Sequence, residues 1–139
     1  MNPQRQTIFV ASHPKGRGNC LSAVLASILE MSIDEVIDTT SDAVRDNGFW
    51  KSIHDWLAER GLKIINRPVG HPDLQGNYSI GVGPSPRGPF HHAVVCKSGV
   101  MVFDPHPSDD GVTEIEYHDL IVEMSDAEKK LWAHQKGDK

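Results

Sequence analysis

The chain has 139 residues, of which 38% are hydrophobic and 24% charged, and its net charge at pH 7 is −5. This composition indicates one globular domain, residues 1–139, and the presence of only Cys20 and Cys96 argues against a disulfide-rich secreted domain. The sequence has no basic run suited to binding nucleic acid. We also find no signal peptide and no apolar run of the ~18–20 residues that cross a membrane. We therefore expect a cytoplasmic protein with reduced thiols, no nucleic-acid partner and no membrane attachment.

The first strong helix signal follows a loop. A short strand is expected at 7–10, and the composition of 13–19 is typical of a loop. From Cys20 to Leu29, apolar residues then recur at helical spacing, and Asn19 is a favourable N-cap. The pattern predicts a helix with Cys20 in its first turn.

Two further helices are expected before the middle of the chain. A capping box that begins at Ser32 predicts a short second helix. A third is expected at about 46–61, where Gly61 ends it. We assign four apolar residues of this third helix to the core: Trp50, Ile53, Trp56 and Leu57.

The second half of the chain is predicted to consist mainly of strands, at 62–65, 78–82, 92–97, 100–104 and 113–117. Ser98 and Gly99 favour a two-residue hairpin turn, whereas the Gly and Pro residues of 83–89 indicate a loop. Ser125 is expected to cap a final amphipathic helix that ends in a charged tail. The predicted fold class is α+β, with N-terminal helices packed on a C-terminal antiparallel sheet.

Cys20 is a candidate nucleophile because it is predicted to lie at the start of a helix. The thiolate is the reactive form, and a free Cys, with a pKa near 8.5, is mostly protonated at neutral pH. A helix N-terminus supplies partial positive charge and unpaired N–H groups, both of which favour the thiolate. A free Cys is more commonly a small buried apolar residue, however, so Cys20 alone does not define a site.

His92 and Asp104 complete a possible triad. His92 begins one strand of the predicted hairpin and Asp104 ends the other, and a turn at Ser98 and Gly99 places Asp104 near the level of 92–93. An imidazole can take the proton of a thiol, and a carboxylate can orient that imidazole. Singly, these residues are typical of a surface histidine and a turn aspartate; together with Cys20 they indicate a Cys-His-Asp triad.

Three motifs carry a resemblance to a known superfamily. They are GNCLSAVLAS at 18–27, HAVV at 92–95 and DP at 104–105. In this order they resemble papain-like cysteine peptidases, and are closer to the compact bacterial leader-peptide peptidase domains of bacteriocin exporters than to papain. The chain also resembles small phage and bacterial proteins that combine the HAVV strand with a GPSPRG loop and a DPHPS segment, which stand here at 83–88 and 104–108.

The resemblance implies a papain-like fold with three catalytic residues: the nucleophile Cys20, the general base His92 and the orienting Asp104. In the superfamily, a Gln shortly before the Cys donates to the oxyanion hole, but Pro14 stands at that point here. We therefore expect Gln6 to fold back and donate, with Asn19 as the second candidate and the backbone N–H of Cys20 as the other donor.

Substrate-binding residues are expected in the two loops beside the hairpin. Arg87, in the Pro- and Gly-rich loop before His92, is suited to binding a carboxylate. Ser85 in the same loop and His106 after the second strand are further candidates. The eight histidines lack the spacing of a metal site, so we expect neither a metal nor another cofactor.

The leading hypothesis is a thiol hydrolase that forms an acyl-enzyme: a peptidase, isopeptidase or amidase with a peptide or protein-conjugate substrate. Release of the acyl group to an amine instead of water would make it an acyltransferase, and the sequence leaves both open. The alternative is a non-catalytic binding or inhibitor module of phage origin on the same fold. An active thiolate would distinguish the two, and the sequence does not indicate an oligomeric state.

Overall fold

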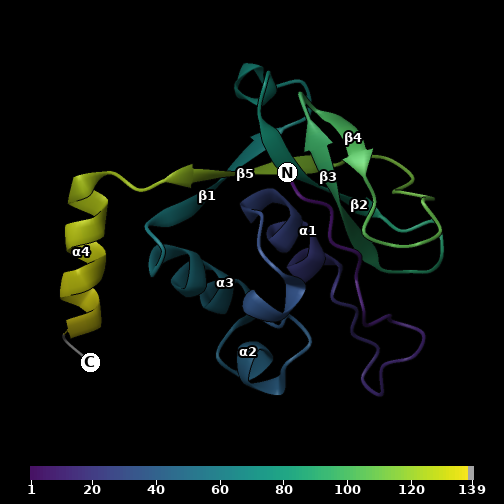
Figure 1. Cartoon of the computed structure of the whole chain (residues 1–139), viewed down its shortest axis with the longest axis horizontal. Coiled ribbons are helices and arrows are strands. Elements are labelled where there is room, and N and C mark those ends of the chain that lie inside the picture. Colours follow the sequence, from purple (N-terminus) through teal and green to yellow (C-terminus); the bar gives the residue numbers. More distant parts are fainter. Residues whose placement is uncertain (138–139) are drawn as a thin grey trace.

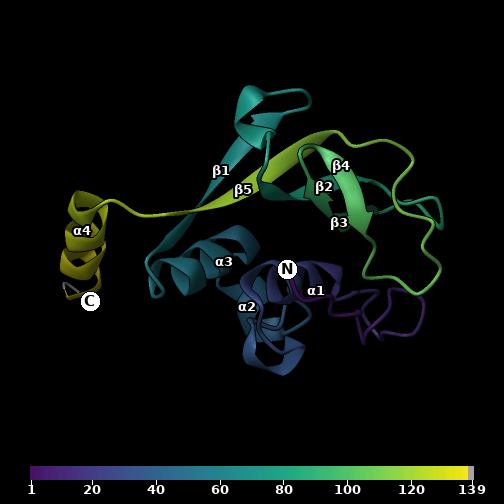
Figure 2. The same cartoon turned by 45° about the horizontal axis from the view of Figure 1, so that its top comes forward.

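The computed structural model describes residues 1–137 and has an α+β architecture, which confirms the predicted class (Figure 1). The helical elements are α1 (Cys20–Leu29), the 3-10 turn η1 (Ile33–Glu35), α2 (Asp42–Asp46), α3 (Phe49–Ala58), the 3-10 turn η2 (Pro72–Leu74) and α4 (Asp126–Gly137). The strands are β1 (Leu62–Pro68), β2 (Tyr78–Pro84), β3 (His91–Lys97), β4 (Val100–Phe103) and β5 (Tyr117–Glu123). Helices α1 and α3 lie against one face of the sheet, whereas α4 stands apart at its far end (Figure 2).

Helix α1 is the centre of the core. Its residues 21–27 are all buried, because α1 packs on β3 and β2 on one side and is covered by the N-terminal tail on the other. Ser27 ties that tail down, since its carbonyl accepts from the amide of Asn2 at 2.9 Å and its hydroxyl from the amide of Gln4 at 2.8 Å. Leu25 meets Ile53 of α3 in the same cluster of fully buried side chains. The start of α1 is therefore held firmly under the sheet.

The sheet is antiparallel, with strand order β1-β5-β2-β3-β4. Side chains alternate between its faces. Ala93 and Val95 are on the face that packs against the helices and belong to the core cluster. Val94 and Cys96 are on the opposite face, where the segment that follows β4 buries them. This segment crosses β2 so closely that a Cβ at Gly83 would overlap the carbonyl oxygen of Glu114. The missing side chain at 83 thus lets the loop after β4 fold back over the sheet.

Several local predictions are confirmed. α1 begins at Cys20, although the side chain of Asn19 before it makes no capping hydrogen bond, and capping boxes begin at Ser32 and Ser125. The β3–β4 hairpin turns at Ser98 and Gly99, whose φ angles of 52° and 81° are those of a turn with two left-handed residues. The charged tail expected after α4 includes residues 138–139, which lie outside the described residues.

Three predicted elements differ from those observed. Residues 7–10 form no strand, because the side chain of Asn19, rather than a neighbouring strand, accepts from the amides of Thr7 and Ile8. The helix expected at 46–61 is present as α3 but spans only Phe49–Ala58, because Gly48, with a φ of 94°, separates it from the unexpected short helix α2. The strand expected at 113–117 starts only at Tyr117 and runs on to Glu123.

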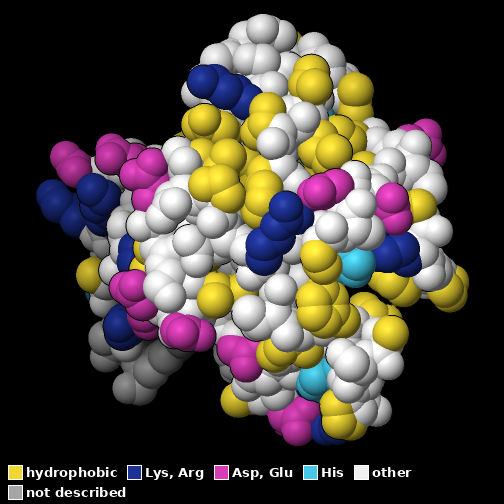
Figure 3. Space-filling view, turned by 45° about the vertical axis from the view of Figure 1, so that its right-hand side comes forward, with side chains coloured by type: hydrophobic (Ala, Val, Ile, Leu, Met, Phe, Trp, Pro, Cys, Tyr) yellow, Lys and Arg dark blue, Asp and Glu magenta, His cyan; other side chains and the backbone are white. Residues whose placement is uncertain are grey.

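The outer surface of the hairpin is apolar. Strand β4 is an edge of the sheet and exposes Val100, Met101 and Val102. Hydrophobic side chains gather on the face that holds this edge, beside scattered charged groups (Figure 3). Within the described residues, the structure has no helix with the length and apolar character needed to cross a bilayer.

The central place of α1 gives a stability prediction. Leu25→Ala should lower the free energy of unfolding by about 2–5 kcal/mol, because it leaves a cavity in the core. Leu131→Ala makes the same substitution on the exposed face of α4 and should change it by less than about 0.5 kcal/mol. Urea denaturation measures both, and similar losses in the two variants would contradict the packing described for α1.

Candidate active site

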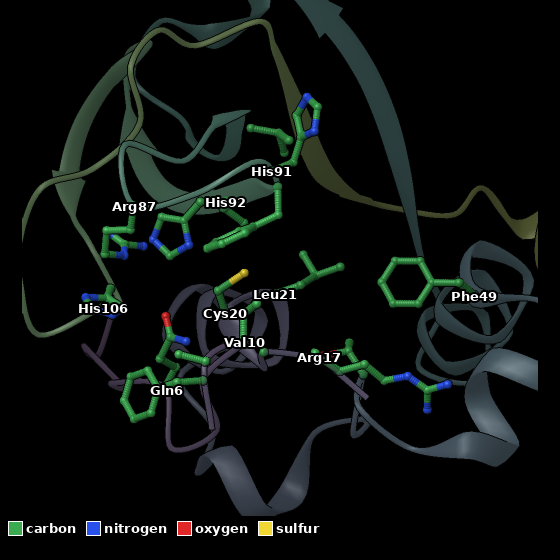
Figure 4. A pocket seen from close by; sticks show the side chains of 18 of the residues that line it. Gln6, Val10, Arg17, Cys20, Leu21, Phe49, Arg87, His91, His92 and His106 are labelled. Carbon is green, nitrogen blue, oxygen red and sulfur yellow. The ribbon is translucent and has the colours of Figure 1, made fainter. Parts of the chain in front are cut away.

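Cys20 is the first residue of α1 and is partly exposed. As a residue of the first turn, its amide has no partner within the helix. Its side chain points into a cavity between α1 and the start of β3 (Figure 4). The thiol therefore lies where the positive end of the helix meets an accessible space.

His92 and Asp104 are in direct contact beneath the surface. The Nε2 atom of His92 donates to Oδ1 of Asp104 at 2.7 Å, and the two side chains are only 3% and 1% exposed. A bulge between Val95 and Cys96 shifts the hairpin register by one residue from the regular pairing. Asp104 follows the end of β4, where it reaches back to the imidazole across the hairpin.

The carboxylate of Asp104 is supplied with backbone donors as well. Its Oδ1 accepts from the amide of His106 at 2.9 Å, and its Oδ2 from the amide of Gly111 at 2.8 Å. Burial alone would raise the pKa of this carboxyl, but the bonds from His92 and these two amides outweigh burial and lower the pKa to about 2. Asp104 is therefore ionised and acts as an acceptor toward His92.

Nε2 of His92 forms the hydrogen bond to Asp104. Because Nε2 faces Asp104, Nδ1 is the ring nitrogen left to interact with the Cys20 thiol, which acts on the titration of His92. Burial disfavours the charged imidazolium, yet the hydrogen bonds with Asp104 and Cys20 outweigh it and raise the pKa of His92 to about 9. The imidazole is thus a strong enough base to hold a proton at neutral pH beside the thiol.

Gln6 lies beside Cys20, whereas Asn19 does not reach the cavity. The Gln6 side chain is directed toward the thiol (Figure 4), with Nε2 bonded to the carbonyl of Ile8 at 3.0 Å and Oε1 without a partner among the described residues. Its second Nε2 hydrogen remains available. The amide of Asn19 is engaged with the tail, since Oδ1 accepts from Thr7 and Ile8 and Nδ2 donates to the Thr7 hydroxyl. The expectation for Asn19 as an oxyanion donor is therefore corrected: its side chain holds the tail in place.

The cavity has a volume of about 580 Å³. Arg87 and His106, from the two loops expected to flank the cleft, line it on one side of Cys20 (Figure 4). Ser85 does not line it, which corrects its assignment to substrate binding. The hydroxyl of Ser85 instead accepts from the amide of Arg87 at 3.1 Å and shapes the loop.

Two contributions to the site were not expected from the sequence. Arg5 holds the loop after β4, because its Nη1 donates to the carbonyls of Asp104 and His106, at 3.0 Å each. Trp50, assigned to the core, is 41% exposed and lines the cavity with Phe49. The spacing of Trp50 from Ile53 and Leu57 is that of one helix face, so the sequence pattern did not reveal that Trp50, in the first turn of α3, is exposed.

Comparisons of the chain with known protein families, curated proteins and solved structures gave no match. The resemblance to papain-like peptidases therefore stays a prediction. Among residues 1–137, no group of three or more His, Cys, Asp or Glu side chains is placed to hold a metal ion. The side chains available for chemistry in this cavity are a thiol, an imidazole and a carboxylate in series.

The contact with Asp104 predicts the titration of His92. Asp104→Asn should lower the pKa of His92 from about 9 by about 1 to 3 pH units, because the buried imidazolium loses its carboxylate partner. NMR titration of the histidine ring nitrogens measures this pKa. Asp110→Asn removes an exposed carboxylate from the same loop and should leave it unchanged. Equal midpoints in the two variants would show that Asp104 does not set the charge of His92.

Proposed function

We propose that this protein is a thiol hydrolase of the papain-like type, with Cys20 as nucleophile, His92 as general base and Asp104 as the orienting residue. The observation that carries the proposal is the arrangement of one buried imidazole between a carboxylate on Nε2 and a thiol at the start of a helix on the other side. A thiol, a base in contact with it and a group that orients the base are the parts that a thiol nucleophile requires.

The mechanism follows from these contacts. His92 takes the thiol proton, and the Cys20 sulfur bonds to the substrate carbonyl carbon. The backbone N–H of Cys20 and the free Nε2 hydrogen of Gln6 donate to the developing oxyanion. The imidazolium then gives its proton to the departing amine as the C–N bond breaks, which leaves a thioester that water hydrolyses with His92 as the base.

The proposed fold is papain-like, since a helix that begins with the nucleophile packs against the sheet that bears the base. The proposed substrate is a peptide or protein conjugate, because the site is built for acyl transfer from an amide. An amine in place of water would turn the same intermediate into an acyl-transfer product. We place the protein in the cytoplasm, where the free thiols of Cys20 and Cys96 stay reduced.

The two cysteines should react at very different rates. Iodoacetamide near pH 6 should modify Cys20 well before Cys96, because Cys96 is fully buried and burial raises the pKa of its thiol to about 11. His92→Ala should slow the Cys20 reaction by about 10-fold or more, since the base that takes the proton is lost. Peptide mass spectrometry of timed samples gives both rates.

His91→Ala is the matched control for that experiment. His91 is the neighbouring histidine, but its ring is exposed and bonded to Glu116 at 2.7 Å, away from the thiol. This variant should react like the wild type. Equal rates at the two cysteines, or a Cys20 rate that ignores the loss of His92, would contradict the proposal and favour a binding module.

An acyl probe tests the covalent step itself. A peptide ending in an electrophilic ketone should label wild-type Cys20 in a 1:1 ratio, and Cys20→Ala should abolish labelling, because the sulfur supplies the bond. Cys96→Ala should retain it. Intact-protein mass spectrometry detects the adduct, and a wild-type chain that binds the peptide without an adduct would contradict the hydrolase.

A further inference from the structure

The cavity beside Cys20 is basic although the whole chain is acidic. The net charge of the chain is −5. Among the described residues 1–137, no Asp or Glu lines the cavity, whereas four cationic side chains do: Lys15, Arg17, Arg45 and Arg87. A concentration of one charge sign in a recess attracts ligands of the opposite sign. The cavity is therefore suited to an anionic substrate.

Arg87 is the cation best placed to bind that anion. Lys15 and Arg17 share the single carboxylate of Asp42, at 2.7 Å each, so both are held in ion pairs although one of their two positive charges is left over. Arg87 donates to the hydroxyl of Ser108 at 3.1 Å, and no carboxylate of the described residues forms an ion pair with it. Because a guanidinium has five N–H donors, most of those on Arg87 remain available to a ligand.

Arg87 lies on the side of the cavity that holds the base. Ser108, its partner, also contacts Nδ1 of His106 at 2.8 Å, and the His106 ring stands edge-on to His92 with 6.2 Å between the ring centroids. Figure 4 shows Arg87, His92 and His106 together on one side of Cys20. His92 protonates the departing amine in the proposed mechanism, so this is the leaving-group side.

The opposite side of the cavity is aromatic but also cationic, since the Arg45 guanidinium lies 4.6 Å from the centroid of the Phe49 ring. Leu21 and Phe49 lie there, across Cys20 from Arg87 (Figure 4). Trp50 extends this surface, with its ring edge-to-face on Phe49 at 5.3 Å between centroids. Aromatic surfaces of this kind bind apolar side chains by burial of area and by ring contacts. This side is suited to the acyl half of a substrate.

We infer that the site releases the C-terminal residue of peptides. The residue before it, which is apolar or aromatic, lies at Phe49 and Trp50, and the departing C-terminal amino acid binds Arg87 through its free carboxylate. This inference rests on the proposed function and names its substrate class. The Cys20 sulfur bonds to the last peptide carbonyl, the C–N bond breaks, and the proton on His92 moves to the departing amine. Water then releases the acyl group, and the carboxylate on Arg87 is unchanged throughout.

The test measures binding of two matched compounds to Cys20→Ala, which cannot turn them over. The compounds are benzyloxycarbonyl-Phe-Ala and its C-terminal amide, and calorimetry gives their dissociation constants. The acid should bind about 10- to 100-fold more tightly, as expected for charge-assisted hydrogen bonds. Adding Arg87→Gln should remove this preference. Arg67→Gln, at an arginine paired with Asp73 outside the cavity, should keep it.

The possible failures are distinguishable. Equal affinities for the two compounds, or no binding of either at millimolar concentration, would overturn the inference. A preference that disappears with Arg45→Gln and survives Arg87→Gln would also overturn it, because the carboxylate would then lie on the wrong side of Cys20. If wild-type Cys20 reacts rapidly with iodoacetamide in these cases, only the substrate class is wrong. If the carboxylate preference depends on Arg87 but wild-type Cys20 does not react with iodoacetamide, the proposed hydrolase is contradicted, whereas the binding of a carboxylate by Arg87 stands.

Discussion

The buried hydrogen bond between His92 and Asp104 is the contact on which the rest of the site depends. An ionised carboxylate without solvent is costly unless every lone pair finds a donor. At the end of β4, the imidazole supplies one donor, and the amides of His106 and Gly111 supply the others. The loop after β4 must therefore close around Asp104, and it can do so because Gly83 lets the following segment cross β2. The conformation of the loop after β4 is thus a consequence of the buried charge.

The N-terminal tail is coupled to the same loop. Arg5 bonds to the carbonyls of Asp104 and His106, and the next amide, that of Gln6, donates to the carbonyl of Pro105 at 3.0 Å. Asn19 holds the tail from the other side, directly before Cys20. These contacts deliver the Gln6 amide to the thiol from a point fourteen residues upstream. Tail, helix and hairpin therefore form one unit, in which displacement of the loop would also displace the proposed oxyanion donor.

The sequence allowed prediction of features that depend on neighbouring residues. Periodicity placed the start of α1 at Cys20, and Ser98 with Gly99 defined the hairpin that brings Asp104 to His92. Features that depend on distant partners were missed. Asn19 looked like an ordinary cap because its bonds to the tail cannot be read from local spacing. β5 was misplaced because His118 and Asp119, polar residues in the middle of a strand, are buried there by Ser79 and Asn66, which stand far away in the chain.

A comparison of His92 with the neighbouring His106 shows that the Asp104 carboxylate, and not the cavity, determines the pKa of His92. Burial and the nearby charge of Arg87 lower the pKa of His106, as expected for an imidazole in a basic recess. His92 lies 6.2 Å away between ring centroids, is more deeply buried, and yet has its pKa raised to about 9. The difference is direct contact with Asp104 and Cys20. A recess lined by cationic side chains disfavours a charged imidazole, so the buried aspartate is what allows His92 to carry a charge there.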